Sequence, residues 1–179
     1  MAAYRDGDDA VAFERLYRRH RGALFRYLLR QCGNASSAEE LFQDVWLNVV
    51  RARRNYVAEA RFATYLYRIA HNRLIDYYRR SVHRVSVAAA DGDCDPVERI
   101  AAEPNNQPEV QLAAREQVER FRVLLAGLPE AQREAFVLHE EAGLSIEEIA
   151  VATGVNPETA KSRLRYAVTK LRRAMLELA

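Results

Sequence analysis

Residues 145–173 constrain the fold more than any other stretch, because they hold two successive helix starts separated by one glycine. Ser145 and Glu148 have the spacing of a capping box, in which each side chain accepts a hydrogen bond from the other residue's amide. Gly154 can take the positive φ that ends a helix, and Asn156, which precedes a proline, can begin the next one. The stretch therefore predicts a helix, a short turn and a second helix.

The second of these helices has two unlike sides. At 100° per residue, one side is apolar and consists of Ala160, Leu164, Ala167, Val168, Leu171 and Met175. The other side and its flanks carry Glu158, Thr159, Lys161, Ser162, Arg163, Arg165, Tyr166, Thr169, Arg172 and Arg173. Helix-turn-helix proteins lay such a helix in the major groove of DNA, so we expect duplex binding here. The alternative is a charged helix that only faces solvent at the end of a small bundle.

Length and composition place the chain among ordinary globular proteins. It has 179 residues, of which 49% are hydrophobic and 29% charged, enough for one or two domains. No apolar run approaches the roughly 18 residues of a membrane span, and the first residues lack a secretion signal. We therefore expect a cytoplasmic protein without membrane insertion. Cys32 and Cys94 belong to no ligand spacing, so we expect reduced thiols and neither a disulfide nor a metal site.

Charge divides the chain into three parts. Residues 1–84 hold 16 Lys and Arg against 9 Asp and Glu, whereas residues 85–108 hold 1 against 5 and residues 109–179 hold 10 against 11. The middle part is also rich in proline and has no apolar period, which is typical of a flexible linker. Within the last part, the basic charge lies at the C-terminal end, where residues 159–179 hold six Lys and Arg against one Glu. Two basic regions joined by an acidic connector favour two contacts on one polyanion.

The first part predicts three helices, at about 11–29, after Ser37, and at about 61–80. Ser37 stands three residues before Glu40, in capping-box spacing. The second helix has an inward stripe of Phe42, Val45, Trp46, Val49 and Val50. Its outward face includes Gln43, Asp44, Leu47 and Arg51. An exposed leucine is common on protein surfaces, but among these polar side chains it also has the layout of a protein-docking patch.

Residues 51–84 combine nine arginines, against two acids, with several aromatic side chains. Arginines bind any phosphate backbone, and aromatic rings among them offer faces on which unpaired bases can stack. We therefore expect the loop at 53–62 to bind single-stranded nucleic acid, although some tyrosines, such as Tyr77, can simply fill a helix interface. The third helix is predicted to turn Thr64, Arg68, His71, Asn72, Ile75 and Arg79 away from the core.

Residues 110–125 and 129–140 have the pattern of two further amphipathic helices, which lead into the helix-turn-helix stretch. The predicted fold is all-α, with two small helical domains. The first has three helices, the second has four, and the acidic linker joins them.

The chain resembles a sigma factor of the bacterial sigma-70 family, of the small extracytoplasmic-function (ECF) kind. In the first half, residues 38–46, AEELFQDVW, resemble the family's polymerase-docking helix, and residues 62–73, FATYLYRIAHNR, resemble its signature for melting and reading the −10 element. In the second half, several short motifs between residues 128 and 164 resemble the −35-reading domain. The resemblance spans almost the whole chain.

The resemblance implies that the protein is not an enzyme, needs no cofactor, and gives core RNA polymerase its promoter specificity. It assigns polymerase contact to Gln43, Asp44, Leu47 and Arg51. It assigns the single-stranded −10 element to Tyr56, Phe62, Tyr65, Arg68 and Asn72. It assigns the −35 duplex to Thr159, Lys161, Ser162, Arg163, Arg165 and Tyr166. It also implies control by an anti-sigma factor, and a linker that threads the polymerase near its RNA exit route.

Two positions depart from the family pattern. The family usually has Trp where this chain has Tyr65, which predicts a weaker stacking partner during strand separation. It usually has Arg where this chain has Tyr166, so that position can either approach phosphate or stack on a thymine methyl group.

Two other functions compete with this interpretation. A helix-turn-helix regulator that acts without polymerase would bind its duplex site as a free protein. A metal-dependent hydrolase is suggested by His139 and Glu140, but the HExxH motif requires histidine at the position of Gly143.

Overall fold

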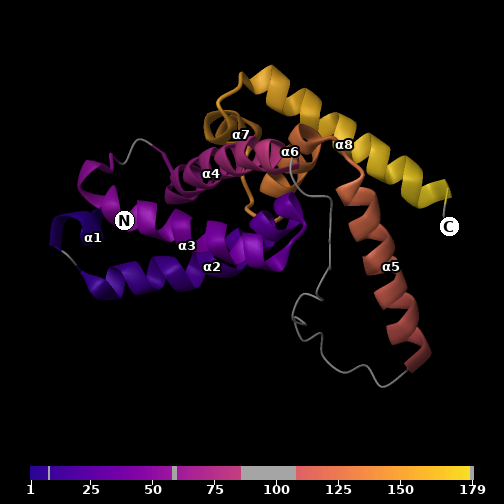
Figure 1. The fold of residues 1–179 in the computed structure, drawn as a ribbon, viewed down its shortest axis with the longest axis horizontal. Coiled ribbons are helices and arrows are strands. Elements are labelled where there is room, and N and C mark those ends of the chain that lie inside the picture. Colours follow the sequence, from indigo (N-terminus) through magenta and orange to yellow (C-terminus); the bar gives the residue numbers. More distant parts are fainter. Residues whose placement is uncertain (8, 58–59, 86–107, 178–179) are drawn as a thin grey trace.

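The computed structural model describes residues 1–7, 9–57, 60–85 and 108–177, and every regular element within these ranges is a helix (Figure 1). The all-α prediction is therefore confirmed. In chain order the elements are α1 (Ala2–Gly7), α2 (Ala10–Cys32), α3 (Ala35–Arg51), the 3₁₀ helix η1 (Arg53–Asn55), α4 (Phe62–Val85), α5 (Pro108–Ala126), α6 (Glu130–Glu140), α7 (Ile146–Thr153) and α8 (Pro157–Glu177). The linker predicted at 85–108 falls, except for its two end residues, outside the described residues, as does Cys94.

The helix-turn-helix prediction is confirmed in α7 and α8. The Ser145 amide donates to a Glu148 carboxylate oxygen at 2.9 Å, and the Glu148 amide donates to the Ser145 hydroxyl at 3.2 Å. Gly154 ends α7 at a φ of 67°, a conformation that glycine adopts without strain. The Asn156 side chain then accepts from the Thr159 amide at 2.7 Å and caps α8.

The first domain, α1 to α4, differs from the prediction at two helix starts. Helix α3 begins at Ala35 rather than after Ser37, because the Asn34 side chain accepts from the Ser37 amide at 2.9 Å and provides the cap one turn earlier. Helix α1 was not predicted, and it folds back onto η1, where Arg5 donates to the Tyr56 carbonyl at 2.9 Å.

The core of the first domain lies where α2, α3 and α4 pack together. Fully buried side chains come from each helix: Leu24 and Leu28 from α2, Val45 and Val49 from α3, and Leu66 from α4. At one end, the rings of Phe13, Tyr17 and Phe42 surround Trp46. Val50 was predicted to face inward and is instead 36% exposed, because it lies at the edge of the buried stripe of α3.

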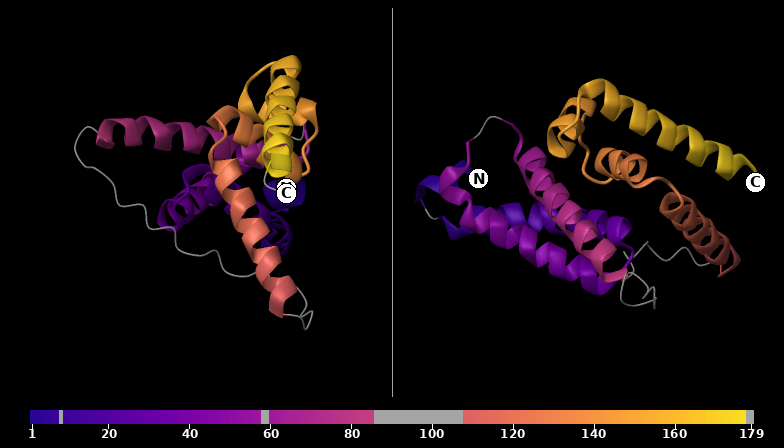
Figure 2. Two further views of the ribbon diagram at one scale, coloured as in Figure 1. Left: turned by 90° about the vertical axis from the view of Figure 1, so that its right-hand side faces the viewer. Right: turned by 45° about the horizontal axis from the view of Figure 1, so that its top comes forward.

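The second domain, α5 to α8, packs directly on the first (Figures 1 and 2). Helix α7 lies against α4 and α6 lies against α2, while α5 projects away from the body. This packing buries two residues that were expected to face away from the core: Thr64 is 2% exposed and His71 is largely buried. They do face away from the core of the first domain, but the second domain covers them.

Candidate nucleic-acid and polymerase interfaces

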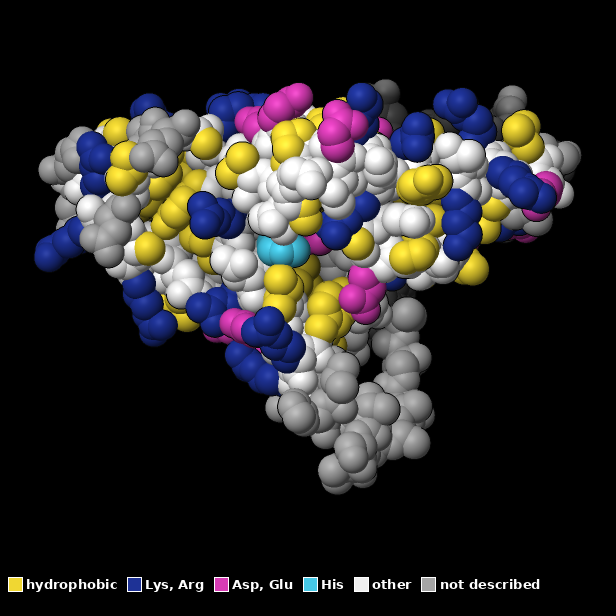
Figure 3. Space-filling model, turned by 90° about the horizontal axis from the view of Figure 1, so that it is seen from above, with side chains coloured by type: hydrophobic (Ala, Val, Ile, Leu, Met, Phe, Trp, Pro, Cys, Tyr) yellow, Lys and Arg dark blue, Asp and Glu magenta, His cyan; other side chains and the backbone are white. Residues whose placement is uncertain are grey.

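The polar face of α8 is open at its N-terminal half. Lys161, Arg165 and Tyr166 are exposed there, whereas Ala160 and Ala167 on the opposite side are buried. Thr159, Ser162 and Arg163 are partly buried at the edges of this face. Figure 3 shows Lys and Arg side chains recurring along the part of the surface that α8 forms. The six residues predicted for duplex DNA thus lie within two turns of one helix, and each of them is separated by three or four positions from another.

Arg165 and Tyr166 interact with each other in the free chain. The Arg165 guanidinium carbon lies 5.4 Å from the centroid of the Tyr166 ring, at the distance of a cation–π contact. The ion pair of Lys161 with Glu158 spans 3.9 Å on an exposed surface, which makes it a weak interaction. These side chains can therefore turn toward a ligand at little cost.

The aromatic residues predicted for the −10 strand form one cluster at the start of α4. The ring of Tyr65 lies 5.0 Å from that of Tyr56 and 6.3 Å from that of Phe62, measured between centroids. Burial, followed by the proximity of Tyr56, raises the pKa of Tyr65, so its phenol stays neutral. Tyr56 itself is only 5% exposed, so it would have to move before a base could stack on its face. Residues 58 and 59 of this loop lie outside the described residues.

A hollow of about 350 Å³ lies beside this cluster, between the end of α3 and the middle of α4. Its lining residues are Asn48, Arg51, Ala52, Tyr65, Ile69, Asn72 and Arg73. Asn72 and Tyr65 were predicted for the −10 strand and Arg51 for polymerase, so the hollow joins residues of two predicted sites. Asn48 and Arg73 were not assigned by the sequence analysis, and they hold each other through a 3.4 Å hydrogen bond. Arg68 lies one turn before Asn72 on α4, and both are exposed.

The four residues predicted to contact polymerase share one face of α3. Gln43, Leu47 and Arg51 follow one another at intervals of one turn and are exposed, and Asp44 lies beside them, partly buried. Leu47 is 48% exposed and stands among these polar side chains. The helix thus presents an apolar side chain within a polar rim, as protein interfaces often do.

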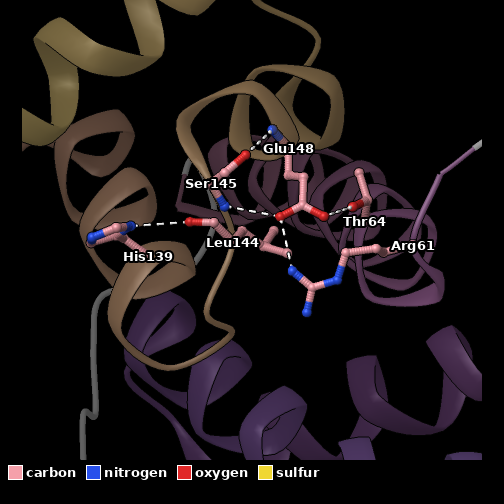
Figure 4. Close-up of polar contacts among 6 residues, drawn as sticks. All are labelled: Arg61, Thr64, His139, Leu144, Ser145 and Glu148. Carbon is pink, nitrogen blue, oxygen red and sulfur yellow. Dashed lines mark hydrogen bonds and ion pairs between the residues drawn. The ribbon is translucent and has the colours of Figure 1, made fainter.

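The histidine of the hydrolase alternative has a structural role. A ring nitrogen of His139, Nδ1, lies 3.0 Å from the Leu144 carbonyl oxygen and supports the turn between α6 and α7 (Figure 4). Among the described residues, no three His, Cys, Asp or Glu side chains come together as a metal would require. In the same part of the chain, no helix combines the length and apolar character needed to span a membrane.

Comparison with protein families places both halves of the chain. Residues 16–84 match the family model described as Sigma-70 region 2, and residues 119–171 match the one described as Sigma-70, region 4. The first match contains the hollow and the exposed leucine, and the second contains the helix-turn-helix. Two regions in this order define an RNA polymerase sigma factor.

Full-length relatives agree with this assignment. The chain is 33% identical to the RNA polymerase sigma factor CarQ of Myxococcus xanthus, over 99% of this chain and 97% of that protein. It is 32% identical to the ECF RNA polymerase sigma factor RpoE of Cereibacter sphaeroides, over 98% of this chain and 92% of the relative.

Solved structures share the fold. CnrH, solved with the cytosolic domain of CnrY, is 25% identical and superposes with a TM-score of 0.68 over 99% of this chain and 94% of its own. The sigma factor RpoE of Bartonella quintana, solved with the anti-sigma factor NepR, superposes with a TM-score of 0.70 over 92% of this chain and 96% of its own, at 23% identity.

The chain belongs to the ECF group of the sigma-70 family of RNA polymerase sigma factors. It therefore binds core polymerase and is not itself an enzyme. This membership decides against the helix-turn-helix regulator that acts without polymerase.

Proposed function

We propose that this sigma factor divides its work among three surfaces. The face of α3 around Leu47 binds core RNA polymerase, together with Gln43, Asp44 and Arg51. The α8 face from Thr159 to Tyr166 reads the −35 duplex. The observation that carries the proposal is that one chain presents all three surfaces: an exposed leucine within a polar face on α3, an exposed polar face on α8, and the hollow between α3 and α4.

The surface for the −10 element is the hollow between α3 and α4 together with the aromatic cluster. Tyr65 offers a ring face, Asn72 offers an amide that can pair with a base edge, and Arg68 is placed to meet phosphate. Tyr56 and Phe62 extend the aromatic surface toward the preceding loop.

The functional units follow the charge pattern: residues 1–84 bind polymerase and the −10 element, 85–108 connect, and 109–179 bind the −35 element. The chain works in the cytoplasm, where core polymerase and promoter DNA are found. An anti-sigma factor controls it. Two similar chains support this part of the proposal: the sigma factor solved with the anti-sigma factor NepR, and CnrH, solved with the cytosolic domain of CnrY.

Run-off transcription with purified core polymerase tests the proposal. We expect a product that depends on both the added chain and a promoter with −35 and −10 elements, and co-elution of the chain with core enzyme. Neither product nor co-elution on a broad set of promoters would overturn it.

Replacing Arg165 with alanine should weaken use of the −35 element by about 1–3 kcal/mol, the usual value of a side chain that contacts a base edge. Arg172→Ala is the matched control, because it removes the same charge from the same side of α8 two turns later. Transcription from promoters with intact and substituted −35 elements measures both. An equal loss in the two variants would mean that Arg165 contributes only general charge.

A further inference from the structure

Three glutamates of the second domain lie at its contact with the first domain. The carboxylate of each one accepts hydrogen bonds from polar groups of the first domain. Glu141, at the end of α6, accepts from Arg26 Nε at 2.6 Å and from Arg30 Nε at 2.9 Å. Burial opposes ionisation of Glu141 most strongly, but the hydrogen bonds and charges of the two arginines together outweigh it, so its pKa is lowered. This carboxylate is therefore charged at neutral pH.

Glu134, in the middle of α6, makes the most enclosed of these contacts. One of its carboxylate oxygens accepts from the Tyr27 hydroxyl at 2.6 Å and lies 2.7 Å from His71 Nδ1. Burial, followed by the charge and the hydrogen bond of Glu134, raises the pKa of Tyr27. The phenol therefore keeps its proton and donates it in a hydrogen bond to the carboxylate. A carboxylate that is only 9% exposed requires such partners, and both of them belong to the first domain.

Glu148 links the helix-turn-helix to the beginning of α4 (Figure 4). The oxygen that accepts from the Ser145 amide also accepts from Arg61 Nη1 at 3.1 Å, and the other oxygen accepts from the Thr64 hydroxyl at 3.2 Å. The capping carboxylate of α7 therefore also holds the beginning of α4, the helix that carries the proposed −10 surface.

This closed arrangement does not fit a promoter. The −35 and −10 elements lie about 25 base pairs apart, which is roughly 85 Å of duplex at 3.4 Å per base pair. In the structure α7 packs directly on α4, so the two reading surfaces are parts of one compact body. The domains must separate before both can bind, and residues 86–107, when fully extended, allow them to move apart by up to about 75 Å.

We propose that Glu134, Glu141 and Glu148 form an interdomain latch that keeps the free chain closed and unable to engage both promoter elements at once. The biological consequence of the latch rests on the proposed function. Whether the latch exists can be measured on the free chain without DNA. The three glutamates bind basic and hydroxyl groups at α2 and α4. When polymerase draws the two domains apart, these contacts break and the chain opens.

The test compares Glu141→Lys with Glu140→Lys in the full-length chain. The first variant sets a positive charge against Arg26 and Arg30, whereas the second makes the same charge change at an exposed neighbour. We expect a larger radius of gyration by small-angle X-ray scattering for Glu141→Lys only. The triple variant Arg26→Glu, Arg30→Glu, Glu141→Lys should regain the compact form, because it restores opposite charges.

DNA binding by the free chain gives the second readout. For a DNA that carries the −35 duplex and a single-stranded −10 segment, Glu141→Lys should bind about tenfold more tightly than Glu140→Lys, as expected when the open state rises from about a tenth to most of the population. For the −35 duplex alone, the two variants should bind equally. Should Glu141→Lys lose its helical content, Glu134→Gln replaces it, with the same expected expansion.

The latch is wrong if Glu141→Lys and Glu134→Gln both keep the radius of gyration of the wild type. If instead the variants expand but wild-type protein directs no transcription with core polymerase, the latch stands and the proposed function fails. Expansion without tighter binding to the two-element DNA would mean that closure does not restrict promoter binding.

Discussion

Leu47→Asp should remove the association of the chain with core RNA polymerase. An exposed apolar side chain within a polar rim is typical of an interface centre, where truncation costs about 2–4 kcal/mol, or roughly 30- to 1,000-fold in affinity. A charge in its place adds the cost of burying an unpaired carboxylate. The fold should survive, with a loss below about 1 kcal/mol, because the leucine is already 48% exposed. Size-exclusion co-elution and circular dichroism measure the two effects.

Val11→Asp is the matched control for this experiment. It makes a similar change on the same domain, at a side chain that is 55% exposed and lies on α2, away from the predicted docking face. We expect it to co-elute with core enzyme as the wild type does. A misfolded Leu47→Asp would mean that the leucine supports the core, and unchanged co-elution would mean that polymerase binds elsewhere.

Leu138→Ala should destabilise the second domain by about 2–5 kcal/mol, the usual range for a fully buried leucine whose removal leaves a cavity. Leu138 has no exposed surface and lies in α6 at the centre of that domain. This loss is a large part of the 5–15 kcal/mol that holds an average domain folded. Urea unfolding followed by circular dichroism should show a lower midpoint, and −35-dependent transcription should fail at a lower temperature.

Val151→Ala provides the comparison, because it also trims an aliphatic side chain of the second domain. Val151 is 53% exposed on α7, so its change should stay within about 0.5 kcal/mol. Equal midpoints for the two variants would show that the packing around Leu138 relaxes to fill the space, contrary to our expectation.

Features that depend on neighbouring residues could be predicted from the sequence. The capping box of Ser145 and Glu148, the left-handed Gly154 and the Asn156 cap are each set within four residues, and all three were predicted at their observed positions. The predicted start of α3 was wrong because the local sequence offers two good capping residues, Asn34 and Ser37. Only the folded structure selects between them.

Features that depend on the meeting of the two domains could not be predicted. Thr64 and His71 have the spacing of a solvent-facing stripe, and their partners Glu148 and Glu134 lie more than 60 residues away in sequence. Nothing in the local pattern of Glu134 distinguishes it from a surface glutamate. The hollow between α3 and α4 could not be predicted either, because Asn48 and Arg73 come together only when the two helices pack.

The ring cluster of the first domain provides the chain with its own optical probe. Trp46 is the single tryptophan of the sequence, is 6% exposed, and lies among Phe13, Tyr17 and Phe42. Its emission therefore reports the unfolding of one half, whereas the circular dichroism signal averages both. In Leu138→Ala, coincident melting curves from the two signals would mean that the halves unfold as one cooperative unit, and separated curves would mean that they unfold independently.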